Sequence, residues 1–467
     1  MNGRGSKRST IRVVHVVLAL LFLLPIGARA FDLLDAYRLA VQNDPTIMGQ
    51  RQDLAVAVDQ VRISRSALLP SLGANSQLGR TGGPVSYTGM PLVDRTFNAV
   101  GWTVQLNIPL LHVQDIEAYR ESHRLADQAN AQFSVAEQDL IIRVVQAYFG
   151  VLVAQESLAA ATAQIRAATE QRIAAKHRFD TGVGSITDVD EAATKAAMAR
   201  YESLSARSEV QSKRADLEKI IGSFPDVTLL ALRDDVRISA PDPAEVDPWV
   251  EHAREDNPSV MAGEAAVDAA GLEVERARAQ RLPTLDLVGS YGRNYSSGNN
   301  VNPIDFATNA IAETAMLQFN MPIVDGGAMQ GKIAQAGAKE EKAQAQLDAA
   351  RRQVAVDARD AFEGVMDGLE QIRALRFALD AGIRAVTGNR KGYRVGLRTN
   401  LDVLDAQRQR YAAQRDLAKA RYETLLQSLK LKAAAGALGI ADLLRLNAML
   451  TSAQSRSPAY DSPSAVE

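Results

Sequence analysis

The chain has 467 residues, of which 53 are basic and 55 acidic, and its formal net charge is −2. This length suits several domains or one large repeated body. With no basic surplus and no charged tail, the composition does not favour a nucleic-acid partner. Cysteine is absent, so no disulfide and no lipid-modified cysteine is available, and the fold depends on packing alone.

Residues 1–30 have the pattern of a secretory signal peptide. Basic residues such as Arg8 come first, the apolar run Val13–Leu24 follows, and Ala28–Ala30 offers a small-x-small cleavage site. The alternative is a membrane anchor, although the run is shorter than the roughly 20 residues of a spanning helix. Beyond residue 30 we find no apolar run of that length, so a mature chain in a membrane is expected to use strands.

Sequence landmarks recur at a constant spacing, which indicates a tandem duplication. Pro45 and Pro258 are 213 residues apart, and so are Pro70 and Pro283. We expect a first repeat over 31–222, a linker over 223–243, a second repeat over 244–436 and a C-terminal helical segment over 437–450. The Ser/Ala/Pro-rich stretch 451–467 is predicted to be disordered.

Each repeat is predicted to open with helices and then to contain two strands. In the clearest one Val100, Trp102 and Val104 alternate with polar residues, a period of two. The predicted strands cover about 71–80 and 99–109, and about 284–293 and 314–322. Strands of this length fit a membrane β-barrel, but a half-buried sheet of a soluble domain alternates in the same way.

Four strands are too few to close a barrel, for which about eight is the working minimum. Open sheet edges are not tolerated in lipid. If these are membrane strands, identical copies have to pool them.

A long helix is predicted after each second strand, over Leu111–Phe179 and Gly326–Tyr393. Apolar residues spaced three and four apart form a coiled-coil-like seam in the first of them. At 1.5 Å per residue such a helix spans roughly 100 Å. Shorter helices return over Thr187–Ile221 and Leu401–Ala435. These lengths indicate a tube or stalk rather than a globular core.

Two similar turns connect the long and returning helices, at about 180–187 and 394–400. They read FDTGVGSITDVDEA and YRVGLRTNLDVLDA. Glycine ends the first helix of each pair, because it tolerates positive φ. Ser185 and Thr399 are predicted N-caps, and Asp188 and Asp402 three residues later suggest an acidic capping box in both turns.

These segments resemble the TolC family of outer-membrane channels, and specifically its type I secretion members. The motifs that carry the resemblance are GYRVGLRTNLDVLDAQ, AKARYETLLQSLKLKAAAGAL, HRFDTGVGSITDV, LLP and RLPTLDL, and together they cover nearly the whole mature chain. The resemblance implies an α+β membrane protein, a tandem-duplicated protomer that gives four strands to a shared 12-stranded outer-membrane β-barrel. In this family a long α-helical periplasmic barrel with coiled-coil hairpin tips extends the β-barrel into the periplasm. It also implies a homotrimer in the Gram-negative outer membrane, in contact with lipid, a periplasmic adaptor (membrane fusion) protein and an inner-membrane transporter of ABC type.

The resemblance assigns roles to residues at the turns. It implies a pore constriction at Asp402 and Asp405, although Asp402 also suits helix capping. It implies an entrance gate in which Tyr393 and Arg398 bridge to the neighbouring hairpin, whereas a solvated arginine and a packed tyrosine are the plain interpretation. The implied gate consists of Tyr393, Arg398, Thr187 and Asp188. The implied adaptor-contacting residues are Gly182, Gly184, Ser185, Gly396 and Thr399.

The predicted function is an outer-membrane channel-tunnel of a type I secretion system that exports a protein, an RTX-type toxin being one candidate. The alternative is the outer-membrane component of a tripartite multidrug or metabolite efflux pump. A periplasmic coiled-coil adaptor or scaffold is a third hypothesis, of a different class. We find no catalytic motif and expect no enzyme, cofactor or metal site.

Overall fold

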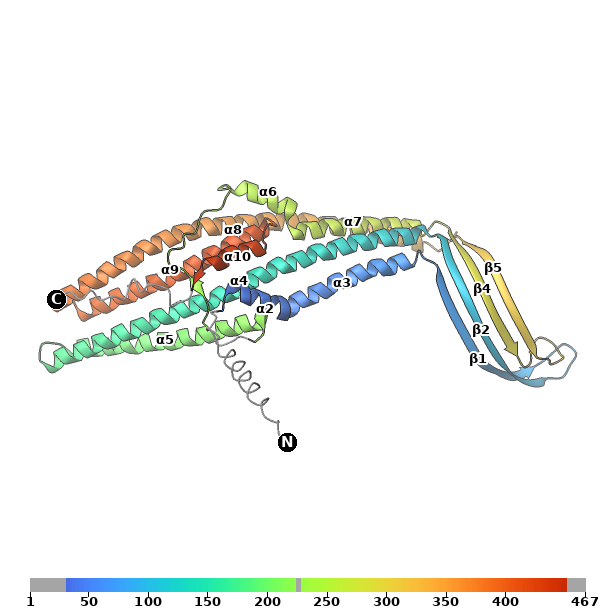
Figure 1. Ribbon diagram of the computed structural model, residues 1–467, viewed down its shortest axis with the longest axis horizontal. Coiled ribbons are helices and arrows are strands. Elements are labelled where there is room, and N and C mark those ends of the chain that lie inside the picture. The colour runs from blue at the N-terminus through green and yellow to red at the C-terminus, as the bar shows by residue number, and fades with distance from the viewer. Residues whose placement is uncertain (1–30, 224–227, 452–467) are drawn as a thin grey trace, which may run out of the picture.

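The computed structural model describes residues 31–223 and 228–451 as an elongated protomer with a β-sheet at one end and helical hairpins at the other (Figure 1). The predicted signal peptide 1–30, residues 224–227 of the predicted linker and the predicted tail from 452 onward lie outside the described residues.

Four strands form one antiparallel sheet in the order β1-β2-β4-β5. They are β1 (Ser71–Val85), β2 (Val93–Leu111), β4 (Thr284–Ser296) and β5 (Thr308–Asn320). All four strands extend further than predicted toward the loops that connect β1 to β2 and β4 to β5. Backbone pairing continues to Val85 with Val93 and to Ser296 with Thr308, through Gly- and Asn-rich stretches where the apolar alternation has already stopped. An alternation of apolar and polar residues indicates which side chains are buried, whereas strand pairing needs only hydrogen bonds between backbone groups.

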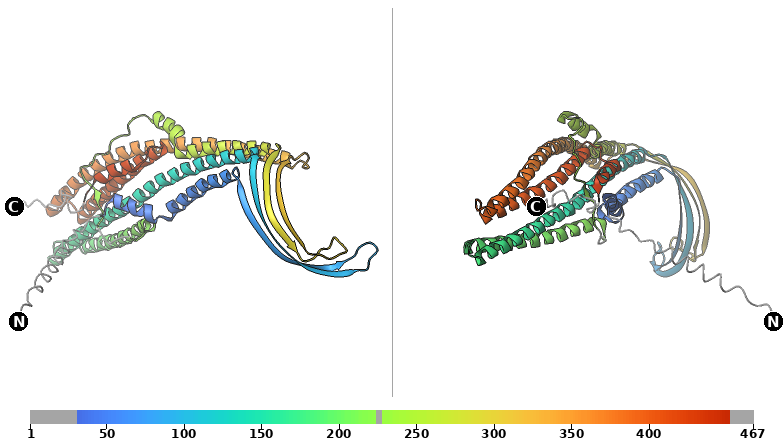
Figure 2. Two further views of the ribbon diagram at one scale, coloured as in Figure 1. Left: turned by 45° about the vertical axis from the view of Figure 1, so that its right-hand side comes forward. Right: turned by 60° about the vertical axis from the view of Figure 1, so that its left-hand side comes forward.

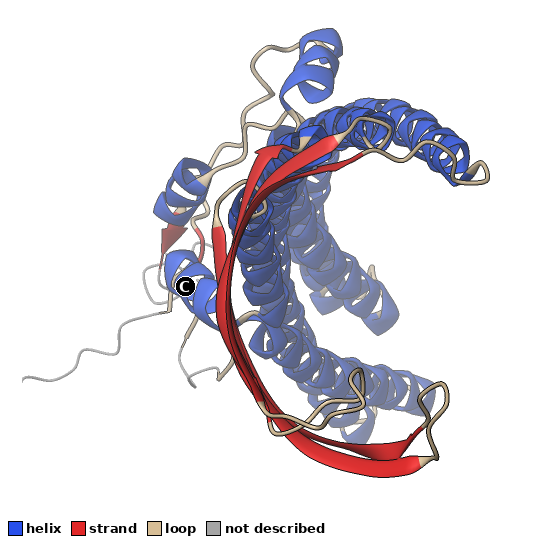
Figure 3. Ribbon diagram, turned by 90° about the vertical axis from the view of Figure 1, so that its right-hand side faces the viewer, coloured by secondary structure: helices blue, strands red, loops and turns tan. Residues whose placement is uncertain are grey.

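The sheet bends strongly, and the helices behind it bend in the same sense, so the protomer forms an open trough (Figure 3). Within the described chain, β1 and β5 each have a partner on one side only. The trough therefore ends in two unpaired strand edges.

Two long helices run from the sheet to the far end, α4 (Val113–Asp180) and α8 (Ala328–Arg394). The returning helices α5 (Ile186–Ile221) and α9 (Asn400–Ala434) pack along them. The hairpins α4–α5 and α8–α9 form two separate tips (Figure 2). Because each turn ends one helix and caps the next, the chain reverses within a few residues.

Shorter helices extend the returning helices back toward the sheet. These are α3 (Pro45–Ser66), which continues the line of α5, and α7 (Pro258–Ala279), which continues that of α9. Asn43 Nδ2 donates to the carbonyl of Ile221 at 2.8 Å, and Asn257 Nδ2 donates to that of Ala434 at 2.8 Å. Both repeats thus use an asparagine to satisfy a C-terminal carbonyl of the returning helix.

A belt of short elements lies along the outer side of the helical body (Figure 3). It contains α2 (Leu33–Asn43), α6 (Val246–Asp256), α10 (Ile440–Ala448) and the short strands β3 (Ala231–Leu232) and β6 (Leu450–Thr451), which pair with each other. The predicted linker 223–243 is therefore more than a connection, because β3 lies within it. Leu229 and Leu232 are almost fully buried, so this stretch is part of the core.

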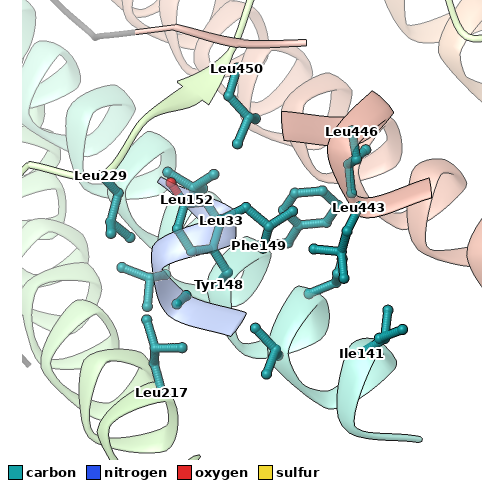
Figure 4. Packing of buried hydrophobic residues seen from close by; sticks show 14 of the residues in the cluster. Leu33, Ile141, Tyr148, Phe149, Leu152, Leu217, Leu229, Leu443, Leu446 and Leu450 are labelled. Carbon is teal, nitrogen blue, oxygen red and sulfur yellow. The ribbon is translucent and has the colours of Figure 1, made fainter. Parts of the chain in front are cut away.

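The main core lies under this belt, around Tyr148 of α4 (Figure 4). The Tyr148 hydroxyl is 3.0 Å from the carbonyl of Phe31 and 2.9 Å from that of Leu230, and it donates to this pair. Burial raises the pKa of Tyr148. By length and composition α4 is apolar enough to cross a membrane, contrary to the sequence-based expectation, but 44% of its most apolar stretch is buried inside the protomer.

Candidate functional site at the hairpin tips

The first tip is a tight turn between α4 and α5. Gly182 adopts φ of +74°, a region that side chains rarely enter. The N–H groups of Val183 and Gly184 both donate to the carbonyl of Arg178, at 2.9 and 3.0 Å, and so satisfy the end of α4. Ser185 then begins α5, its Oγ accepting from the N–H of Thr187 at 3.1 Å.

The second tip repeats this geometry between α8 and α9, with Gly396 at φ of +79°. Here the cap is reciprocal. Thr399 N–H donates to Asp402 Oδ2 at 2.9 Å, and Asp402 N–H donates to Thr399 Oγ1 at 3.2 Å. This is the predicted capping box. At the first tip the predicted N-cap Ser185 is confirmed, but the predicted capping box is wrong. In the described structure the Asp188 carboxylate accepts no hydrogen bond from the Ser185 N–H.

Asp402 therefore has a structural role. Hydrogen bonds from the backbone N–H and then the hydroxyl of Thr399 lower the pKa of Asp402, and nearby Arg398 acts in the same direction. The Asp402 carboxylate is therefore ionised at neutral pH and lies at the turn of the second hairpin.

Near the tips, an ion pair and a cation–π contact connect the first hairpin to the second. Lys195 Nζ of α5 lies 3.1 Å from Asp405 Oδ1 of α9. The guanidinium of Arg178 at the end of α4 lies 4.8 Å from the ring centroid of Tyr393 at the end of α8. Both pairs are partly buried, so they are placed by the packing of the two hairpins.

An apolar contact supports these pairs. Leu404, the neighbour of Asp405, is 6% exposed and packs with small residues of the first hairpin. The buried residues of this cluster are Ala168, Ala175, Ala192, Ala199 and Leu404. Alanines on α4 and α5 leave room for the leucine of α9, and the two hairpins are thereby held at close range.

The structure brings together some, but not all, of the predicted gate residues. Within one described protomer, no hydrogen bond or ion pair joins Tyr393 or Arg398 to Thr187 or Asp188. Tyr393 instead contacts Arg178, and the Arg398 side chain lies against Gly392. The predicted adaptor-contacting residues do lie together at the two turns.

Sequence reasoning missed Arg178 and Lys195. A signal was present in the comparison of the two repeats. The positions that match Arg178 and Lys195 in the second repeat are Gly392 and Gln409, so each cation occurs in one repeat only. A charge that breaks the internal symmetry is a candidate for a contact between the repeats. Among the described residues, no cluster of His, Cys, Asp and Glu could hold a metal ion.

A bent membrane-type sheet with two open edges, continued by helical hairpins, defines a protomer of an outer-membrane channel. The chain belongs to the outer membrane efflux protein family, whose sequence model matches residues 36–223 and 249–437, one stretch in each repeat. It is a Gram-negative outer-membrane protein. The resemblance to TolC-type channels is confirmed.

Three relatives illustrate the match. The chain is 31% identical to alkaline protease secretion protein AprF of Pseudomonas aeruginosa, over 91% of this chain and 88% of the relative. It is 31% identical to proteases secretion protein PrtF of Dickeya chrysanthemi, over 91% and 93%. It is 28% identical to outer membrane protein TolC of Escherichia coli, over 94% and 89%. These relatives bear the names of outer-membrane and secretion proteins rather than of enzymes.

Solved structures share the fold. The Campylobacter jejuni CmeC outer membrane channel superimposes with a TM-score of 0.74 at 15% identity, covering 89% of each chain. The Vibrio cholerae outer membrane protein VceC gives 0.71 at 19% identity, covering 86% of this chain and 96% of that one.

Proposed function

We propose that this protein is the outer-membrane channel of a type I secretion system and exports a protein substrate. It works as a homotrimer with a periplasmic adaptor and an inner-membrane ABC transporter. The observation that carries the proposal is the four-stranded sheet whose two outer edges are unpaired in the protomer. Lipid does not hydrogen-bond such edges, so β5 of one copy pairs with β1 of the next, and three copies close a ring of twelve strands.

The surface of the edge strands fits this assembly. Leu72 and Leu78 of β1 are 72% and 81% exposed, and Leu317 of β5 is 66% exposed. Large apolar side chains left open on a protomer are expected to meet lipid or a neighbouring copy. The helices continue the trough away from the sheet, so the same threefold closure encloses a tunnel through the periplasm.

The choice of a protein substrate follows from the relatives. AprF and PrtF are both named for protease secretion, and each matches about nine tenths of this chain. A protein thread in transit also suits a long, passive duct. An RTX-type toxin is one cargo of this class. The second candidate, small-molecule efflux, is favoured by the 26% identity to outer membrane efflux protein BepC of Brucella suis.

The tips form the periplasmic entrance in this proposal. Asp402 and Asp405 line its constriction, and Tyr393 and Arg398, with Thr187 and Asp188 of a neighbouring hairpin, hold it closed. The adaptor docks on residues of the two turns: Gly182, Gly184, Ser185, Gly396 and Thr399. The separation of the two tips from the sheet by helices of 68 and 67 residues supports this assignment, because it places the tips far from the outer membrane.

Complementation in a secretion strain tests the proposal. The host lacks its own outer-membrane channel but keeps the ABC transporter and adaptor of a protease secretion system. Expression of this chain is expected to restore protease in the medium. If protease stays in the cells while resistance to small toxic compounds is restored, the efflux alternative replaces it. If the purified protein is a monomer that leaves planar bilayers silent, the channel itself is refuted.

A further inference from the structure

We propose that Lys195 determines the charge, and hence the ion and substrate selectivity, of the channel entrance by neutralising Asp405. The inference rests on the proposed function, because it assumes that the tips surround a pore. It assigns a selectivity role to a residue of the first repeat, although the acidic residues expected at the constriction belong to the second.

The contact is specific. Lys195 Nζ lies 3.1 Å from Asp405 Oδ1, and the two side chains are 34% and 40% exposed. Arg408, one turn further along α9, is exposed, and in the described structure it forms no ion pair with Asp405. The neutralising charge therefore comes from the other hairpin.

The backbone positions of this pair are held by packing. Ala192 and Ala199, which flank Lys195 on the same face of α5, are buried against Leu404 of α9. Lys195 thus extends from the edge of a close helix–helix contact, next to the residue that precedes Asp405. A long lysine side chain at such an edge can cover apolar surface and still present its ammonium group to a carboxylate.

The pair acts through charge more than through stability. A partly exposed ion pair contributes little to stability because water and salt screen it. A charge at a narrow opening, in contrast, acts directly on permeating ions. With Asp405 paired, Asp402 is the constriction aspartate that keeps its negative charge in each protomer. The formal charge of this acidic ring is then half of what the two aspartates alone would give.

The inference predicts opposite effects from the two partners. Lys195→Gln removes the cation and leaves Asp405 unneutralised, so the preference for K⁺ over Cl⁻ is expected to rise, by about twofold or more in permeability ratio. Asp405→Asn leaves the lysine unpaired and is expected to lower the same ratio. The double variant restores the net charge and returns the ratio close to that of the unmodified protein. If the pair only ties the hairpins together, both single variants loosen the entrance and change conductance in the same direction.

The measurement is the reversal potential of the purified, full-length channel in planar bilayers across a KCl gradient near 0.1 M, where charges act over about 10 Å. Lys195→Arg keeps the charge and is expected to behave like the unmodified protein. Lys176→Gln is the matched control, because Lys176 lies near the same tip but pairs with Asp180 of its own helix. A conducting Lys195→Gln channel with an unchanged reversal potential overturns the inference and leaves the proposed channel intact. Silent bilayers with the unmodified protein overturn both.

Discussion

Replacement of Arg178 by alanine is expected to open the entrance. Its guanidinium lies 4.8 Å from the centroid of the Tyr393 ring, and both side chains are partly buried. A cation–π contact contributes about 0.5–1 kcal/mol at exposed sites and about 2 kcal/mol when desolvated, so about 1 kcal/mol per protomer is appropriate here. Three protomers that open together lose about 3 kcal/mol, which shifts the ratio of closed to open entrances by about a hundredfold.

Single-channel recording in planar bilayers measures this shift. Arg178→Ala and Tyr393→Leu are both expected to raise the conductance and the open fraction, since each removes one side of the contact. Tyr393→Phe retains the ring and loses only the hydroxyl, so it is expected to raise the conductance less than Tyr393→Leu does. Arg172→Ala, an exposed arginine on the same helix, is the control for loss of a positive charge.

Two results would refute the reasoning. One is a conductance of Arg178→Ala that equals that of Arg172→Ala. The other is an opening of the channel by Tyr393→Phe that is as large as that by Tyr393→Leu. The second result would identify the hydroxyl as the important group and would support the bridge from Tyr393 and Arg398 to Thr187 and Asp188 that the sequence suggested.

Three further predictions concern stability. Tyr148→Phe leaves the partly buried carbonyl of Leu230 without its hydrogen bond from the hydroxyl. It is expected to destabilise the protomer by about 1–3 kcal/mol in urea unfolding, and an unchanged unfolding midpoint would contradict this. Asn257→Ala loses both the cap on Ser259 and the bond to Ala434, at a cost of about 2 kcal/mol, whereas Asn257→Asp retains the cap and is expected to lose less. His112 connects α4 to the sheet through Asp115 at 2.8 Å and Asp286 at 3.0 Å. Burial lowers the pKa of His112, but the hydrogen bonds to these two carboxylates outweigh it and raise the pKa overall. Its stabilisation is therefore fully present below about pH 6.5 and is lost as pH rises through the raised pKa. The difference in melting temperature between the unmodified protein and His112→Gln should accordingly narrow from pH 6 to pH 8.5. A constant difference would contradict a stabilising role of protonated His112 between Asp115 and Asp286.

Local rules explain what could be predicted from the sequence. The helix ends at Gly182 and Gly396 depend on residues within one turn, and the caps at Ser185 and Thr399 likewise. The spacing of the prolines exposed the duplication, and the period-two pattern located the strands. The strand ends were missed because the added stretches, such as 81–85 and 93–98, consist largely of glycine, proline and polar residues. These residues pair through their backbones without an apolar alternation of side chains.

The sequence alone determined the class of this protein: a duplicated protomer with too few strands to close a barrel and with two hairpin tips. Only the tertiary structure decided which side chains meet at those tips. The pairs Lys195 with Asp405 and Arg178 with Tyr393 join residues about 210 positions apart. Such contacts depend on the rotation and offset of four packed helices, which the buried Leu404 and its alanine neighbours set jointly. A pattern within one helix tells which face is apolar, but it does not tell which residue of another helix that face will reach.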